Sequence, residues 1–188
     1  LELKHQGVGA LMRVRHMKRR KMDVIAAVIT DKDTPSLTHN RIIMNAAEIG
    51  VGAEIIDRSK KVRGKIKNRF VSTMASIVAT LPSYNSNECD IVIDRDKKIF
   101  SKMTMGIVSN GRFLGGGFKA APRALKGTST YKFEDDILYY QASEVKFLPK
   151  ERNVTVSVDG EPIGMLPAIF KSYHNALTIK TETHSSRI

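Results

Sequence analysis

Glycines gather in the middle of this sequence, directly after an apolar run that is typical of a strand. Four of them fall within seven residues: Gly111, Gly115, Gly116 and Gly117. A strand that enters such a cluster must let its backbone pass close to another group, or take positive φ, at that point. Asn110 and Gly111 also form the dipeptide that most strongly favours a tight hairpin. We therefore expect this stretch to shape a contact surface.

Two further short stretches combine turn residues with carboxylates. Asp159 and Gly160 follow the alternating run 154–158 and form a strong signal for a two-residue β-hairpin, with Glu161 as its exposed flank. Residues 134–136 group three carboxylates, a pattern typical of a solvated acidic loop. Taken alone, these stretches predict turns and loops.

Histidine and cysteine offer no catalytic or metal-binding pattern. The five histidines are scattered, and no His-Glu-x-x-His spacing occurs. Cys89 is the single cysteine, so the chain can form no internal disulfide. A zinc site, a histidine-based triad and a serine nucleophile are all disfavoured, and a reducing intracellular compartment is expected.

The charge of the chain points to an anionic partner. The 188 residues carry a formal net charge of +12, which attracts membranes, nucleic acids or phosphorylated ligands. The basic residues concentrate in residues 13–21 and 58–69. These blocks are either solvated helix faces or contacts for an anionic membrane, where each basic residue contributes about 1 kcal/mol. The aromatic content of 6%, without tryptophan, argues against a nucleic-acid platform.

The residue pattern predicts an α+β fold, mainly β: an antiparallel β-sandwich with one long helix and a short N-terminal helix. Apolar residues at every third position predict a helix over residues 3–20, and a spacing of three and four predicts the long helix over 58–80. Gly50 and Gly52 predict a bend, and residues 94–98 predict a hairpin turn. The expected strands are residues 24–30, 41–47, 89–94, 99–108, 137–140, 143–147, 154–158 and 177–181.

The order of these motifs resembles the C-terminal domain of diacylglycerol kinase and sphingosine kinase-type lipid kinases. The glycine stretch followed by Ala121-Pro122-Arg123-Ala124 is its most specific part. Residues 45–54 resemble the family segment Asn-x-Ala-Gly-x-Gly-x-Asp-Ala, with Gly52 in place of its Asp. The resemblance covers residues 22–180. Its other parts are Met22-Asp23-Val24, Arg63-Gly64-Lys65, Asp135-Asp136-Ile137-Leu138 and Val158-Asp159-Gly160-Glu161-Pro162.

The resemblance implies half of a two-domain enzyme that transfers the γ-phosphate of ATP to a lipid hydroxyl of the diacylglycerol or sphingoid type. Family members bind ATP on a separate N-terminal domain, whose Gly-Gly-Asp-Gly-Thr loop this sequence lacks. Residues 1–21 are then a basic helical segment leading in from that missing domain, and the absence of an initiator Met fits an internal start. Residues 22–188 are the β-sandwich domain. We expect the isolated chain to be inactive.

The resemblance also assigns site residues. Glu161 becomes the catalytic residue, which positions the acceptor hydroxyl or a metal-bound water. Asp135 and Ile137 are assigned to Mg²⁺, since one carboxylate with backbone carbonyls and waters suffices for that ion. ATP would bind mainly on the missing domain. The residues assigned to the substrate cleft are Asn110, Gly111, Gly115, Gly116, Gly117, Asp159 and Gly160.

The expected partners are a lipid substrate, an anionic membrane surface and the N-terminal catalytic domain of the same protein; a homodimer is left open and nucleic acid is disfavoured. We expect a cytoplasmic protein that associates peripherally with membranes. Two alternatives remain. One is a non-catalytic basic module that binds anionic lipid or nucleic acid. The other is an NAD kinase-type sandwich, against which the Ala-Pro-x-Ala segment argues.

Overall fold

Strands dominate the fold of this chain. The computed structural model describes residues 14–63, 84–110, 138–150 and 153–181. These residues form one helix, nine strands and a single helical turn at residues 14–16. The elements are β1 (Lys18–Thr30), β2 (Thr38–Ile43), β3 (Ala46–Gly50), α2 (Val51–Arg63), β4 (Asn87–Ile93), β5 (Lys97–Met103), β6 (Met105–Ser109), β7 (Glu144–Pro149), β8 (Thr155–Val158) and β9 (Glu161–Thr181).

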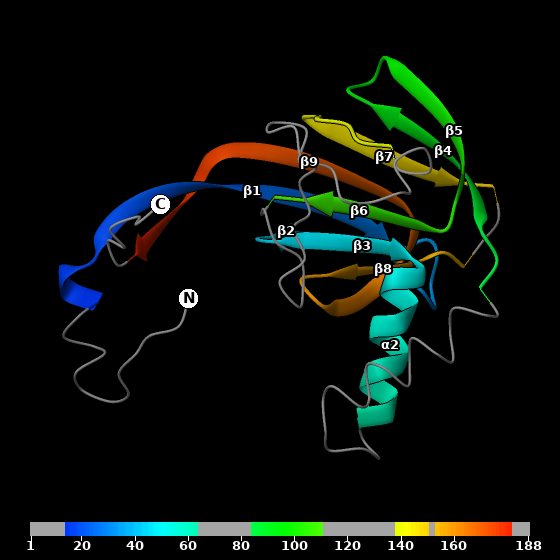
Figure 1. The fold of residues 1–188 in the computed structure, drawn as a ribbon, viewed down its shortest axis with the longest axis horizontal. Helices are drawn as coiled ribbons and strands as arrows, with labels where there is room; N and C mark the ends of the chain where they lie inside the picture. The colour runs from blue at the N-terminus through cyan, green and yellow to red at the C-terminus, as the bar shows by residue number, and fades with distance from the viewer. Residues whose placement is uncertain (1–13, 64–83, 111–137, 151–152, 182–188) are drawn as a thin grey trace, which may run out of the picture.

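All nine described strands belong to one antiparallel sheet. Its order is β5-β4-β7-β9-β8-β3-β6, and β1 pairs with both β9 and β2. The sheet curls into a barrel-like sandwich, and α2 extends from the end of β3 (Figure 1). The predicted class, α+β and mainly β, is confirmed.

The long strand β9 holds the sheet together by changing partners along its length. Its first residues pair with β8, and the later ones pair with β1 on one side and β7 on the other. Gly164 lies at this change of partners, where the backbone carbonyl of Thr30 leaves no room for a Cβ atom. The hydroxyl of Thr30 donates to the carbonyl of Pro167 at 2.8 Å, which fixes the corner. A glycine is required here because two backbones approach closely.

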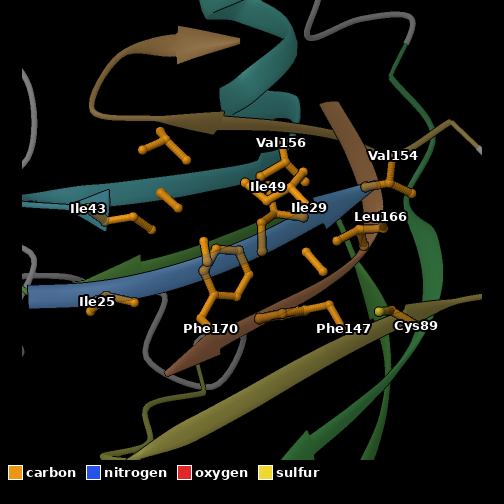
Figure 2. Packing of buried hydrophobic residues seen from close by; sticks show 14 of the residues in the cluster. Ile25, Ile29, Ile43, Ile49, Cys89, Phe147, Val154, Val156, Leu166 and Phe170 are labelled. Carbon is orange, nitrogen blue, oxygen red and sulfur yellow. The ribbon is translucent and has the colours of Figure 1, made fainter. Parts of the chain in front are cut away.

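The core lies inside the curl and takes its side chains from most of the strands (Figure 2). Phe147 and Phe170 meet edge to face, with ring centroids 5.9 Å apart. Ile29, Ile49 and Val156 are fully buried in the same cluster. Cys89 is also fully buried, and desolvation raises the pKa of its thiol to about 11. Core packing, rather than chemistry, accounts for this cysteine.

The helix predictions need correction at their boundaries. Residues 18–20, expected as helix, form the start of β1, because they pair with the end of β9. α2 begins at Val51, seven positions before the expected Arg58, since Gly50 takes φ +79° and turns the chain directly into the helix. Residues 58–63 are helical as predicted. Residues 14–16 form a helical turn. Residues 3–13 and 64–80, which were also predicted to be helical, lie outside the described residues.

Two of the predicted strands are each interrupted once. The strand expected at 41–47 divides at Met44 and Asn45 into β2 and β3, and the strand expected at 99–108 divides at Thr104 into β5 and β6. Residues 138–140 form no strand. The strand expected at 177–181 is the end of β9, which begins 16 residues earlier at Glu161.

The first residues of β1 and the end of β9 differ in character from the rest of the sheet. Lys18–Met22 pairs only with Leu177–Thr181 within the described part of the chain. Figure 1 shows these two strand ends running together away from the body of the sheet. We call this two-stranded extension the arm. No described helix is long and apolar enough to cross a membrane.

Candidate functional site

The structure describes four of the residues that the sequence assigned to a site: Asn110, Asp159, Gly160 and Glu161. Asp159 and Gly160 form the β8–β9 connection, Glu161 begins β9, and Asn110 follows the end of β6. The other predicted residues, Gly111, Gly115, Gly116, Gly117, Asp135 and Ile137, lie outside the described residues. The site is therefore built from the β8–β9 turn and what surrounds it.

Asp159 and Gly160 form the tight hairpin that the sequence predicted. Their φ angles are +48° and +82°, and a two-residue turn of type I′ requires positive φ at both central positions. Val158 and Glu161 pair across the turn. Nothing surrounds the position where a side chain on Gly160 would begin, so this glycine is required for its backbone conformation and not for space.

The Asp159 carboxylate binds a different turn, the one between β2 and β3. Its two oxygens accept hydrogen bonds from the backbone N–H groups of Met44, Asn45 and Ala46 at 2.9–3.0 Å. The N–H of Asp159 donates in return to the carbonyl of Ala46 at 2.8 Å. Hydrogen bonds to an ionised acceptor are stronger than neutral ones. The β8–β9 turn is thus fastened to the β2–β3 turn by four hydrogen bonds.

Asn110 donates hydrogen bonds to carbonyl groups of the same β2–β3 turn. Its backbone N–H donates to the carbonyl of Asn45 at 2.8 Å, and its Nδ2 donates to the carbonyl of Met44 at 3.1 Å. Nδ2 also donates to the carbonyl of Asp23 on β1 at 2.7 Å. The structure therefore brings together two residues that the sequence placed in one site, and both hold the β2–β3 turn.

Glu161 projects from this fastened turn into solvent. It is exposed and begins β9, directly opposite the buried Val158. Because Asp159 fixes the turn two residues earlier, the backbone at Glu161 is held on a short, well-defined path. A carboxylate in this setting can accept a hydrogen bond from a hydroxyl group that approaches the end of the sheet.

A carboxylate that no sequence motif assigned to a site lies close to this one: Glu48, in the middle of β3. It is half-buried and accepts a hydrogen bond from the hydroxyl of the fully buried Ser157, at 2.7 Å. Burial raises the pKa of Glu48, and the nearby charge of Asp159 acts in the same direction. The available signal was an acidic residue between Ala47 and Ile49 in an otherwise apolar strand.

A second overlooked carboxylate, Asp23, lies where the arm leaves the sheet. Its Oδ1 accepts a hydrogen bond from the N–H of Asn175 at 2.8 Å and lies 2.8 Å from Nδ1 of His174. These contacts, the Asn175 bond first, hold the pKa of Asp23 below its usual range. Asp23 is linked to the candidate site because its carbonyl accepts from Asn110.

The described residues offer no ready metal site. Among them, no group of three or more His, Cys, Asp or Glu side chains is arranged to hold a metal ion. The two residues that the sequence assigned to Mg²⁺ lie outside the described part of the chain. The chemistry that the described site supports is hydrogen bonding by a positioned carboxylate.

Comparison with known proteins identifies the fold. No protein-family model and no curated protein matches the sequence. A diacylglycerol kinase from Bacillus anthracis has a TM-score of 0.57 and 16% identity over 95% of this chain and 62% of its own. A second structure from the same organism, of a putative diacylglycerol kinase, has a TM-score of 0.59 and 16% identity over 88% of this chain and 59% of its own. Yeast NADH kinase reaches 0.43 at 13% identity.

The chain thus has a diacylglycerol kinase-like fold, as its motifs predicted. It spans about three fifths of the length of the two Bacillus structures. Sequence identity at this level establishes the arrangement of the strands and leaves the chemistry to the residues themselves.

Replacing Asp159 with Asn should destabilise the chain by about 1–2 kcal/mol, since an amide cannot accept all three N–H groups and loses the charge that strengthens them. Urea denaturation followed by circular dichroism measures the change. Asp96→Asn, at the exposed β4–β5 turn, is the matched control and should change stability little. Equal effects of the two substitutions would show that the Asp159 contacts contribute nothing specific.

Replacing Glu48 with Gln should remove a pH dependence of stability. The folded pKa of Glu48 lies above its ordinary value of 4.5, so the folded state binds more protons than the unfolded state between the two values, and stability falls as pH rises through them. A glutamine at this position can still accept from Ser157 and does not titrate.

Urea denaturation of both proteins between pH 4 and pH 7 tests this. The stability of the wild type relative to Glu48→Gln should decrease with rising pH. Glu88→Gln, at an exposed position, serves as control: the difference in stability between the wild type and this variant should stay constant over the same pH range. A difference between wild type and Glu48→Gln that stays constant over this range would rule out a raised pKa.

Proposed function

We propose that this chain is the substrate-side domain of an ATP-dependent lipid kinase, which transfers phosphate to the hydroxyl of a diacylglycerol-type or sphingoid-type lipid. The observation that carries the proposal is the diacylglycerol kinase-like fold, which extends over 95% of the chain in one comparison. The chain covers 62% of that structure. In the proposal, ATP binds mainly on a further domain, and this chain alone is inactive.

The proposed role of Glu161 follows from where the turn holds it. Phosphoryl transfer depends mostly on positioning the acceptor and on neutralising charge. A carboxylate at the end of a fastened turn accepts a hydrogen bond from the lipid hydroxyl and so aims its oxygen at the phosphate. Glu161 can then take the hydroxyl proton as the lipid oxygen bonds to the γ-phosphorus, while the bond between that phosphorus and the bridging oxygen of ADP breaks and ADP leaves. Asp159 contributes indirectly, because it fixes the turn.

ATP and Mg²⁺ belong to the proposal as well: ATP would supply the phosphoryl group, and Mg²⁺ would neutralise its charge. The described residues include no carboxylate cluster suited to the metal. The residues that the sequence assigned to Mg²⁺, Asp135 and Ile137, lie outside the described part of the chain. The role argued for the described residues is to orient the lipid and to move its proton.

The arm is the proposed contact with an anionic membrane. Arg19 and Lys180 lie directly opposite each other on the arm, and Lys21 lies on the same face, opposite Thr178. All three basic side chains are exposed. A basic surface of this kind also suits the second candidate function, a non-catalytic module that binds anionic lipid. The proposed location is cytoplasmic, at the membrane surface.

Replacing Glu161 with Gln should lower lipid phosphorylation by about 10²–10⁴-fold, the range that a lost acid–base group typically produces. The assay uses the longer protein that contains the ATP-binding domain, with radiolabelled ATP and a panel of diacylglycerols and sphingoid bases. Glu88→Gln is the matched control and should retain full activity.

Three outcomes of this assay decide between the two candidate functions. Loss of activity only in Glu161→Gln supports the role of this residue. Equal activity in all three proteins retains the kinase and removes Glu161 from the mechanism. A folded wild type that phosphorylates no lipid would contradict the kinase and favour the non-catalytic binding module.

Replacing Arg19, Lys21 and Lys180 together with Gln should weaken binding to vesicles. Each basic residue at an anionic surface contributes about 1 kcal/mol, so affinity should fall by about a hundredfold. Co-sedimentation of the 188-residue chain with phosphatidylserine vesicles measures this. The control removes the same charge from β5, at Lys97, Lys98 and Lys102. An equal loss in both variants would mean that net charge, and not the arm, determines binding.

A further inference from the structure

The side chain of Asn110 connects β1 with the β2–β3 turn, two segments that are separated in sequence. Its Nδ2 donates to the carbonyl of Asp23 at 2.7 Å and to the carbonyl of Met44 at 3.1 Å. Both partners are carbonyl oxygens, which can only accept, so the amide must point its nitrogen towards them. The two hydrogens of this nitrogen are therefore both engaged within the chain.

One of these partners marks the point where the arm begins. The pairing of β1 with β9 shifts register between Met22 and Val24, so Asp23 lies at an irregularity. On the opposite strand, Asn175 takes φ +52°. The Asp23 carboxylate binds the N–H of Asn175. Asn110 thus holds the residue whose side chain fixes the junction between the arm and the body of the sheet.

The other partner leads to the β8–β9 turn. Asn110 holds the carbonyl groups of Met44 and Asn45, while Asp159 holds the N–H groups of the same turn. Glu161 follows Asp159 after a single glycine. Hydrogen bonds therefore run without interruption from the junction of the arm, through Asn110 and the β2–β3 turn, to the residues that carry Glu161.

We propose that Asn110 is a positioning residue, which aligns the β8–β9 turn with the junction of the arm and thereby orients the Glu161 carboxylate. The part that concerns Glu161 rests on the function proposed above. The alignment itself rests on the hydrogen bonds alone. A direct contact of Nδ2 with a ligand is less consistent with the structure, because that nitrogen already donates to two carbonyl groups.

Backbone NMR spectra of the 188-residue chain test the alignment without any assay of activity. Asn110→Asp keeps the shape of the side chain but removes both donors and sets a negative charge against two carbonyl oxygens. We expect the amide signals of Gly160, Glu161 and Asn175 to shift, although the hydrogen bonds of Asn110 go to Asp23, Met44 and Asn45 instead. Asn40→Asp adds the same charge on an exposed position of β2 and should leave these signals unchanged.

Shifts confined to the residues that Asn110 itself contacts would overturn the proposal. If Asn110→Asp does not fold, Asn110→Ser replaces it, since serine keeps one donor and introduces no charge. The amide signals of Gly160, Glu161 and Asn175 should then shift as well, by less than expected for the loss of both hydrogen bonds in Asn110→Asp. Unchanged distant signals in a folded Asn110→Ser would contradict the alignment equally well.

The effect on Glu161 is measured in the longer protein by steady-state lipid phosphorylation. A displaced turn should lower kcat on the order of 10–100-fold in Asn110→Asp, while the KM for ATP stays the same, because only the position of the acceptor changes. Unchanged kcat together with shifted signals would show that Asn110 aligns the turn without affecting catalysis, and so would remove its role towards Glu161. A wild type without kinase activity would reject the proposed function, whereas the NMR result would still decide the alignment.

Discussion

The carboxylate of Asp159 is the constraint on which the end of this sheet depends. The turn made of Met44 and Asn45 has neither glycine nor proline to favour it, and its two N–H groups, together with that of Ala46, require acceptors. Asp159 supplies them from a hairpin more than a hundred residues away in sequence. One ionised side chain therefore sets both the geometry of the β2–β3 turn and the distance between two hairpins. The role proposed for Glu161 depends on this fixed position of the β8–β9 turn, because Glu161 follows the turn directly.

Local signals in the sequence were sufficient for the hairpins and insufficient for the long-range pairing. The hairpin predicted at residues 94–98 is confirmed, with its turn at 94–96, and so is the Asp159–Gly160 turn. Both depend on backbone preferences within a few residues. Residues 18–20 were expected to be helical because apolar residues recur at every third position in the stretch before them. They form strand because β9 provides a partner for them. β9 itself was predicted only at its end, since its turning point depends on a contact between Gly164 and Thr30, which no local pattern records.

The candidate site shows the same division. Resemblance selected Asn110 and Asp159, and the structure shows that both bind the β2–β3 turn. Of their partners in that turn, Asn45 opens a recognised segment, whereas Met44 belonged to no motif. Glu48 was within a recognised segment, yet its burial could not be inferred, because that depends on Ser157 lying opposite it in the neighbouring strand. The sequence thus identifies residues that turns require, while the energetics of a carboxylate depend on what the fold brings next to it.

The pairing of β1 with β9 has a consequence for how the chain acquires its structure. Lys18 pairs with Thr181, and Ile29 pairs with Ala168, so the first described strand finds its longest partner in the last described strand to be synthesised. Contacts between residues so distant in sequence slow folding, since a large loop must close before they form. During translation, β1 can pair early only with β2. Its other edge stays unpaired until β9 has been synthesised, and an unpaired edge is where a growing chain is most exposed to association with other chains.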